Sequence, residues 1–167
     1  MGAVFIARLE GIEARHAVKI VALGDGPAAA TRWARFEREA HSLSRLNHAG
    51  VVPVHAFGLV GDGEFGYLAM DWVKGENLEE LQDRGLLSQD QELKIIAGIA
   101  YALAHVHDAG IMHRDVKPAN VIVRADTGLP VLCDFGLVRD ERDASLTKSQ
   151  QLLGTPRFMA PELVTGD

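Results

Sequence analysis

The chain has 167 residues, of which 47% are hydrophobic and 24% are charged, and its formal net charge is −6. This length and composition exclude a disordered chain and allow one soluble domain with a hydrophobic core. The negative charge argues against nucleic acid as a main partner, because phosphate backbones favour clustered Lys and Arg.

The chain shows no sign of an oxidising compartment or of a membrane. Its single cysteine, Cys133, excludes an internal disulfide and is typical of reducing conditions, so we expect a cytoplasmic protein. The longest uncharged run, residues 95–107, is shorter than the roughly 18 residues that suggest a membrane span. We therefore expect no membrane segment within this chain.

The N-terminal part is rich in residues that favour strands. Residues 3–9 and 16–23 are predicted to be two hairpin strands, and a turn follows at residues 24–27. A helix is expected to open at Thr31, because apolar residues then recur at helical spacing. These residues are Trp33, Phe36, Ala40, Leu43 and Leu46. Glu39 falls on the flank of this apolar stripe.

Two more strands are predicted over residues 51–60 and 65–70, and the period then becomes helical. Asn77 with Glu80 predicts a short capped helix. Ser88 with Gln91 forms a capping-box pattern for a longer helix that ends at Gly110. We expect this longer helix to turn four apolar side chains inward, namely Leu93, Ile96, Ala100 and Leu103.

Strands that precede helices indicate an α+β fold with two unequal lobes. The seven histidines show no pattern of zinc ligands. His105 and His107 would point to different sides of a helix, and no cluster of cysteines or carboxylates accompanies them. We therefore expect no structural metal.

The segment after the longer helix carries the chemistry. Residues 113–120 read H-R-D-V-K-P-A-N, and Asp134-Phe135-Gly136 follows. This pattern resembles the catalytic loop and the metal-binding segment of eukaryotic-like serine/threonine protein kinases, the bacterial Hanks type. Other parts of the kinase pattern occur in the expected order. They are Val18-Lys19 in an apolar run, Gly154-Thr155-Pro156 and Ala160-Pro161-Glu162.

The resemblance implies a bilobal protein-kinase-like fold that uses ATP and Mg²⁺. It places an N-terminal lobe at residues 1–70, a hinge at 71–75 and a C-terminal lobe at 76–167. Residues 1–5 resemble only the end of the family's Gly-rich loop, and the family's pattern continues beyond Glu162. The expectation is a partial kinase domain that lacks the first strand, the front of the Gly-rich loop and the last helices.

The resemblance also implies roles for individual residues. Asp115 would accept the proton of the attacking hydroxyl, Lys117 would steady the departing charge, and Asn120 and Asp134 would hold metal ions. Lys19 would bind nucleotide phosphates and form an ion pair with Glu39, although an exposed lysine and a solvated glutamate are the structural alternatives. The full set expected at the nucleotide is Gly2, Val4, Ala17, Lys19, Glu39, Met70, Asp71, Val73 and Ile122. Core packing accounts equally well for Val4, Ala17, Met70 or Ile122 taken singly.

The expected control elements surround the segment after Asp134. In the family, an arginine at the position of Arg114 meets a phosphate on the activation loop. Ser145, Thr147 and Ser149 are equal candidates for that phosphate, and an unmodified loop is the alternative. Thr155 and Lys117 resemble the serine/threonine-specific branch. Leu43, His113 and Phe135 resemble an apolar column that links the two lobes.

The sequence therefore favours a protein kinase that acts on Ser or Thr of protein substrates. The alternative is an ATP-binding pseudokinase or an inactive fragment that serves as a binding module. A small-molecule kinase fits less well, because those usually lack the Ala-Pro-Glu segment. The kinase prediction requires Lys19, Asp115, Asn120 and Asp134 to converge on one cleft.

Overall fold

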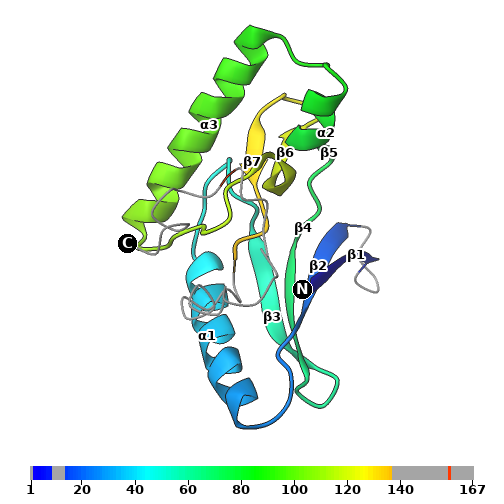
Figure 1. Ribbon diagram of the computed structural model, residues 1–167, viewed down its shortest axis with the longest axis vertical. Helices are drawn as coiled ribbons and strands as arrows, with labels where there is room; N and C mark the ends of the chain where they lie inside the picture. Colours follow the sequence, from blue (N-terminus) through cyan, green and yellow to red (C-terminus); the bar gives the residue numbers. More distant parts are fainter. Residues whose placement is uncertain (1, 9–13, 137–157, 159–167) are drawn as a thin grey trace.

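The computed structural model describes residues 2–8, 14–136 and 158, and every structural statement below refers to these residues. Two groups of elements form the molecule (Figure 1). In that view, the first group occupies the lower part and the second group the upper part. The fold is the bilobal α+β arrangement predicted from the sequence.

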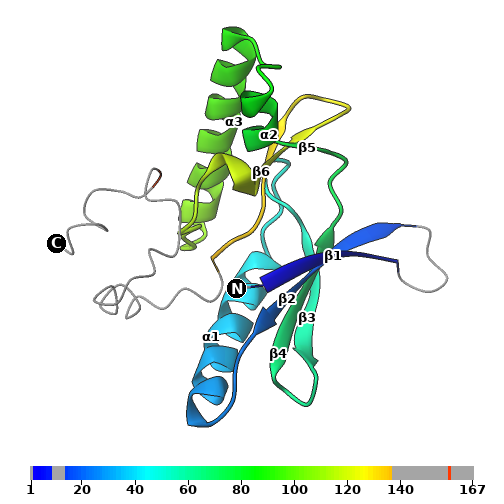
Figure 2. The ribbon, with the colours of Figure 1, turned by 45° about the vertical axis from the view of Figure 1, so that its right-hand side comes forward.

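The first group is an antiparallel sheet with one helix. The sheet has the order β1-β2-β4-β3. Its members are β1 (Gly2–Arg8), β2 (Arg15–Ala22), β3 (Val54–Val60) and β4 (Phe65–Asp71), and the helix is α1 (Pro27–Leu43). The helix lies along one side of this sheet (Figure 2). The four strands match the predicted ones, except that β3 begins three residues later than expected.

The apolar stripe of α1 is buried as predicted. Phe36 and Ala40 are fully buried, and the Phe36 ring lies against Gly66 of β4, where a side chain would crowd it. The start of the helix was predicted wrongly, because α1 begins at Pro27 and not at Thr31. Proline suits the first turn of a helix, since its missing N–H has no helical partner there.

The second group is mainly helical and contains a small antiparallel sheet of order β5-β6-β7. Its elements are β5 (Gly75–Asn77), α2 (Leu78–Asp83), α3 (Gln89–Asp108), the 3-10 turn η1 (Pro118–Asn120), β6 (Val121–Arg124) and β7 (Pro130–Leu132). None of these helices, and no other described helix, combines the length and the apolar character that crossing a membrane requires.

Both helix caps in this group were predicted correctly. Oδ1 of Asn77 accepts a hydrogen bond from the backbone N–H of Glu80 at 3.1 Å. Ser88 and Gln91 form a full capping box, in which each side chain satisfies a backbone N–H of the other residue. Because the unpaired N–H groups are satisfied locally, the sequence alone determines where α2 and α3 begin.

The inward face of α3 was predicted wrongly for three of four residues: Leu103 packs against the core as expected, whereas Ala100 is exposed, as are Leu93 and Ile96. Leu93 and Ile96 are 60% and 61% exposed, whereas Ile95, Ala102 and Val106 are buried. Apolar residues lie on more than one side of this helix, so periodicity alone does not select the face that packs. The packing partner decides, and α3 packs closely on β7, where a side chain at Gly98 would collide with the ring of Pro130.

The two groups are joined by pairing between residues 50–52 and β7. The N–H of Val52 donates to the carbonyl of Leu132 at 3.0 Å, and the N–H of Leu132 donates to the carbonyl of Gly50 at 2.8 Å. Val51 and Leu132 form a parallel bridge. This pairing fixes the end of β7, and therefore the start of the segment that carries Asp134, relative to the end of α1.

Candidate active site

The loop between α3 and β6 holds a carboxylate, an ammonium and an amide together. Nδ2 of Asn120 donates to the main-chain oxygen of Asp115 at 2.8 Å and to Oδ2 of Asp115 at 3.0 Å. Nζ of Lys117 lies 3.1 Å from the same Oδ2. Asn120 is only 4% exposed, so its position in η1 is rigidly set. These contacts orient the carboxylate of Asp115. The side chain of Asp115 keeps partial access to solvent.

Backbone hydrogen bonds tie this loop to the segment that carries Asp134. The N–H of Cys133 donates to the carbonyl of Asn120 at 3.0 Å, which continues the pairing of β6 with β7. The N–H of Gly136 donates to the carbonyl of His113 at 3.2 Å. Asp134 itself has a φ of +60°, which is uncommon for a residue other than glycine and frequent at functional sites. The sequence motifs at 113–120 and 134–136 are thus neighbours in space.

His113 lies between these two segments as a buried, neutral side chain. Its Nε2–H donates to the carbonyl of Cys133 at 3.0 Å, and its Nδ1 accepts from the N–H of Asp115 at 3.4 Å. Burial lowers the pKa of His113 below its ordinary value of 6.5, and the hydrogen bond to Cys133 opposes this only in part. The His113 ring also packs on Phe135, with 4.4 Å between the ring centroids. One tautomer therefore serves both hydrogen bonds.

Cys133 is held as a thiol at the same place. Burial, and secondarily the charge of Asp134, raise the pKa of Cys133 to about 12. Its Sγ donates to the carbonyl of Asn120 at 3.2 Å. This residue is therefore a packing and hydrogen-bonding group of the site and not a nucleophile.

Lys19 reaches the site from the first sheet. It lies in the middle of β2, its side chain is largely buried, and its ammonium forms an ion pair with Asp134. Gly2 of β1 lies beside it, because a side chain at Gly2 would come within 3.6 Å of Cε of Lys19. Lys19 thus contacts Asp134, Cys133 next to Asp134 pairs with Asn120, and Asn120 contacts Asp115, so the four residues lie in one region of the molecule. Their convergence on one cleft remains a prediction.

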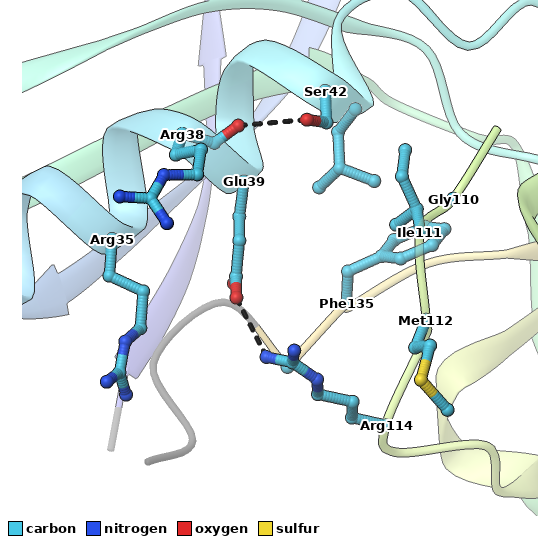
Figure 3. Close-up of a pocket in the computed structure, with 11 residues that line it drawn as sticks. Arg35, Arg38, Glu39, Ser42, Gly110, Ile111, Met112, Arg114 and Phe135 are labelled. Carbon is cyan, nitrogen blue, oxygen red and sulfur yellow. Dashed lines mark hydrogen bonds and ion pairs between the residues drawn. The ribbon is translucent and has the colours of Figure 1, made fainter. Parts of the chain in front are cut away.

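The predicted ion pair between Lys19 and Glu39 is wrong for this structure. Nη1 of Arg114 donates instead to Oε1 of Glu39 at 2.8 Å, while Lys19 binds Asp134 (Figure 3). Arg114 has a φ of +62°. Its guanidinium thus pairs with Glu39, and the nearer carboxylate of Asp134 pairs with Lys19. Burial raises the pKa of Glu39, and the charge of Arg114 opposes that rise.

A cavity of about 300 Å³ surrounds the pair of Glu39 and Arg114. It lies between α1 and residues 110–114, and Phe135 closes one side (Figure 3). Leu43 and Phe135 both line it, so two members of the expected apolar column meet the same space, and His113 contacts Phe135. The sequence analysis missed Arg35 and Arg38, which also line this cavity. Arg35 is four residues from Glu39 and Arg38 is four residues from Ser42 on the same helix, and this spacing was the available signal.

The remaining residues expected at the nucleotide lie where the two groups of elements meet. Ala17 of β2 is directly opposite Met70 of β4, and Asp71 and Val73 follow Met70 along the chain. Val4 of β1 is directly opposite Lys19 of β2. Ile122 of β6 lies against Gly75. Met70 and Val73 are buried, whereas Val4 is exposed. Exposure excludes core packing for Val4, whereas the positions of the other residues suit adenine binding and core packing equally, so their assignment to the nucleotide remains a prediction.

Four of the expected control residues lie outside the described residues, namely Ser145, Thr147, Ser149 and Thr155. The same holds for Ala160-Pro161-Glu162. Their predicted roles remain predictions.

Comparisons with known proteins find similar sequences and similar folds. The family model "Protein kinase domain" matches residues 1–167. The probable serine/threonine-protein kinase PknB of Bifidobacterium longum is 36% identical over 144 residues, which cover 80% of this chain and 21% of that protein. The chain thus spans about a fifth of the length of this relative.

Two solved structures are similar in fold. The kinase domain of Mycobacterium tuberculosis PknI, solved as a double mutant, is 31% identical with a TM-score of 0.72, and the match covers 99% of this chain and 60% of that chain. A Rad53 fragment in complex with AMP-PNP is 27% identical with a TM-score of 0.76, and the match covers 98% of this chain and 39% of that one.

Proposed function

Because this chain belongs to the protein kinase domain family, we propose that it transfers the γ-phosphoryl group of ATP to serine or threonine hydroxyls of protein substrates. One observation carries the proposal: Lys19 pairs with Asp134, the neighbouring Cys133 pairs through its backbone with Asn120, and Asn120 contacts Asp115. It brings a cation for phosphates, oxygen ligands for a metal ion and a carboxylate for the hydroxyl into one place. Phosphoryl transfer needs mainly this positioning and charge neutralisation.

Asp115 is the residue that receives the substrate hydroxyl. Its carboxylate is oriented by Asn120 and lies 3.1 Å from the ammonium of Lys117. It would accept the proton of the attacking hydroxyl on its carboxylate. The ammonium of Lys117 lies beside the same carboxylate, and the substrate hydroxyl would bind there. From this position Lys117 would neutralise charge on the transferred phosphoryl group. This arrangement supports a catalytic role for Asp115, Lys117 and Asn120.

Asp134 and Asn120 suit a hard cation such as Mg²⁺. The side chain of Asp134 is 41% exposed. Nδ2 of Asn120 is used by Asp115, which leaves Oδ1 as a ligand atom. Carboxylate and amide oxygens are the ligands that Mg²⁺ prefers. When bound there, Mg²⁺ would neutralise charge on the nucleotide phosphates.

The nucleotide would lie between β1, β2 and the segment 71–75. Lys19 would bind its phosphates, with Gly2 beside them, and the base would meet Val4, Ala17, Met70, Asp71, Val73 and Ile122. We place the N-terminal lobe at residues 1–70, the hinge at 71–75 and the C-terminal lobe at 76–167. The complex of the Rad53 relative with AMP-PNP supports a nucleotide site in this fold.

Transfer of labelled phosphate from ATP with Mg²⁺ to a general protein substrate such as casein tests the proposal. Asp115→Asn should lower kcat by about 10²–10⁴-fold, because it removes the proton acceptor and preserves the shape of the side chain. The matched control is Asp126→Asn, in the exposed turn after β6, which should leave transfer unchanged. Equal transfer by the parent and by Asp115→Asn would contradict the proposal.

A second candidate is nucleotide binding without transfer. The ion pairs of the structure favour it, because Glu39 is bound to Arg114 and does not hold Lys19. Stabilisation by ATP against heat, with no label transferred by the parent chain, would support this candidate. Transfer that depends on Asp115 would exclude it.

A further inference from the structure

Three strands bring together two histidines that the proposed kinase chemistry does not use and Asp71, which the proposal places near the nucleotide base. His16 begins the buried part of β2, His55 lies in β3, and Asp71 ends β4. Nε2 of His55 lies 2.6 Å from Oδ1 of Asp71. The rings of His16 and His55 meet edge to face, with 5.4 Å between their centroids. One ligand atom from each of the three residues lies within 4.8 Å of the other two.

The sheet itself builds this cluster. His16 and Asp71 are direct partners in the register of β2 with β4. The register of β3 with β4 shifts between Val54 and Ala56, so His55 is the extra residue of a bulge. Bulges re-aim side chains, and this one places His55 beside Asp71. The N–H of Asp71 also donates to the carbonyl of Pro53 at 3.0 Å. This bond holds the end of β4 beside the start of β3.

We propose that His16, His55 and Asp71 form a binding site for a divalent transition-metal ion of the Zn²⁺ class. Two imidazoles and one carboxylate are a donor set that such ions favour, and Mg²⁺ does not. Bonds of about 2.0–2.1 Å put tetrahedral ligand atoms roughly 3.3 Å apart. The most distant ligand atoms therefore need to approach by about 1.5 Å at most, whereas Nε2 of His55 and Oδ1 of Asp71, 2.6 Å apart, need to separate by about 0.7 Å. The side chains of His55 and Asp71 are each 45% exposed, so neither is enclosed by the core.

The three protein ligands leave at least one coordination position for water or for an external ligand. The site differs from the one proposed for Mg²⁺, which is made of oxygen atoms at Asp134 and Asn120. It lies where β4 enters the segment 71–75. A bound ion would link the ends of β2, β3 and β4 at that point, so metal binding should stabilise the first sheet. This site rests on its own geometry and does not depend on the proposed function.

Titration of the metal-free protein with Co²⁺ tests the site, because four-coordinate Co²⁺ absorbs visible light strongly and octahedral Co²⁺ weakly. We expect one strongly absorbing Co²⁺ per chain and its displacement by one equivalent of Zn²⁺. His55→Gln should weaken binding by at least about 100-fold, since even partners outside the ligand set cost 10–100-fold. His16→Gln and Asp71→Asn should behave in the same way. If His55→Gln does not fold, the loss of Co²⁺ binding is measured in His16→Gln and Asp71→Asn instead.

Two controls separate this site from other binding. His107→Gln alters an exposed histidine on α3 and should keep the full signal. Asp134→Asn alters the proposed Mg²⁺ site and should also keep it. Zn²⁺ should raise the Tm of the parent and of His107→Gln, but not that of His55→Gln. Absence of the signal in the parent, its survival in His55→Gln, or its equal loss in His107→Gln or Asp134→Asn would overturn the proposal.

Discussion

Arg114 and Glu39 lie 75 residues apart in the sequence, yet Nη1 of Arg114 donates to Oε1 of Glu39 over 2.8 Å. This pair links the catalytic-loop segment to α1 across a cavity (Figure 3). Its formation means that Glu39 is not available to Lys19, whose ammonium is bound to Asp134. The contacts between the two lobes are therefore made by a different set of partners from the set that the motifs imply.

The pair should contribute a measurable coupling energy. A double-mutant cycle with Arg114→Ala and Glu39→Ala should give about 0.5–1 kcal/mol in urea unfolding, because both side chains are partly shielded from water. The control cycle is Lys94→Ala with Asp90→Ala, an exposed pair one turn apart on α3, which should give about 0.3 kcal/mol. Equal coupling in the two cycles would show that shielding adds nothing.

Removal of the Asn120 side chain should destabilise the loop that carries Asp115. Asn120→Ala removes the buried amide that donates two hydrogen bonds to Asp115, so the free energy of unfolding should fall by about 1–3 kcal/mol. Asn120→Asp should cost more, because it places a second carboxylate beside the first. Urea titration measures both. Asn47→Ala, at an exposed position, should stay within about 0.5 kcal/mol of the parent, and an equally small effect at Asn120 would contradict the prediction.

The buried His113 should make the protein less stable in mild acid. Its pKa is lowered by burial, so below pH 6.5 the unfolded chain takes up a proton that the folded chain does not. Stability should therefore fall as the pH drops from 6.5 towards the lower pKa of the folded state. The slope for this one group is at most about 1.4 kcal/mol per pH unit.

Urea unfolding at pH 7.5, 6.5 and 5.5 measures this slope. His113→Gln removes the titrating group, so its stability should change less with pH than that of the parent. His107→Gln is the matched control, because this histidine is exposed on α3 and its loss should leave the slope unchanged. Parallel slopes in the parent and in His113→Gln would show that His113 does not cause the acid sensitivity.

The thiol of Cys133 should be almost unreactive in the folded chain. A pKa of about 12, against an ordinary 9.0, leaves roughly 10³-fold less thiolate at pH 8. Alkylation by iodoacetamide should therefore be at least about 10³-fold slower than in urea, after correction with glutathione under each condition. Comparable rates in the two conditions would mean that the segment before Asp134 opens freely in solution.

Truncation to alanine should affect stability very differently at two adjacent isoleucines of α3. Ile95 is 3% exposed and Ile96 is 61% exposed. Ile95→Ala should cost about 2–5 kcal/mol, because it leaves a cavity in the core. Ile96→Ala should change stability by less than about 0.5 kcal/mol. Urea unfolding of the two variants is a matched comparison, and the reverse order would return α3 to the orientation expected from periodicity.

Local features of the molecule could be predicted from the sequence. The caps at Asn77 and Ser88 form as expected, because each involves groups only three residues apart. The stripe of α1 from Phe36 to Leu43 is clear, because polar residues occupy the opposite side. The spacing of Asp115, Lys117 and Asn120 within one short loop brought them together whatever surrounds them.

Packing across the molecule decided the rest. α3 has apolar residues on several sides, so only its packing against neighbouring elements could select Ile95 over Ile96. Whether Lys19 binds Glu39 or Asp134, which lies 115 residues away in the sequence, depends on ångström-scale distances that only the packing sets. His16, His55 and Asp71 share no motif, and a register and a bulge bring them together. Charge pairing and metal coordination act over a few ångströms, and the order of residues along a chain does not record such distances.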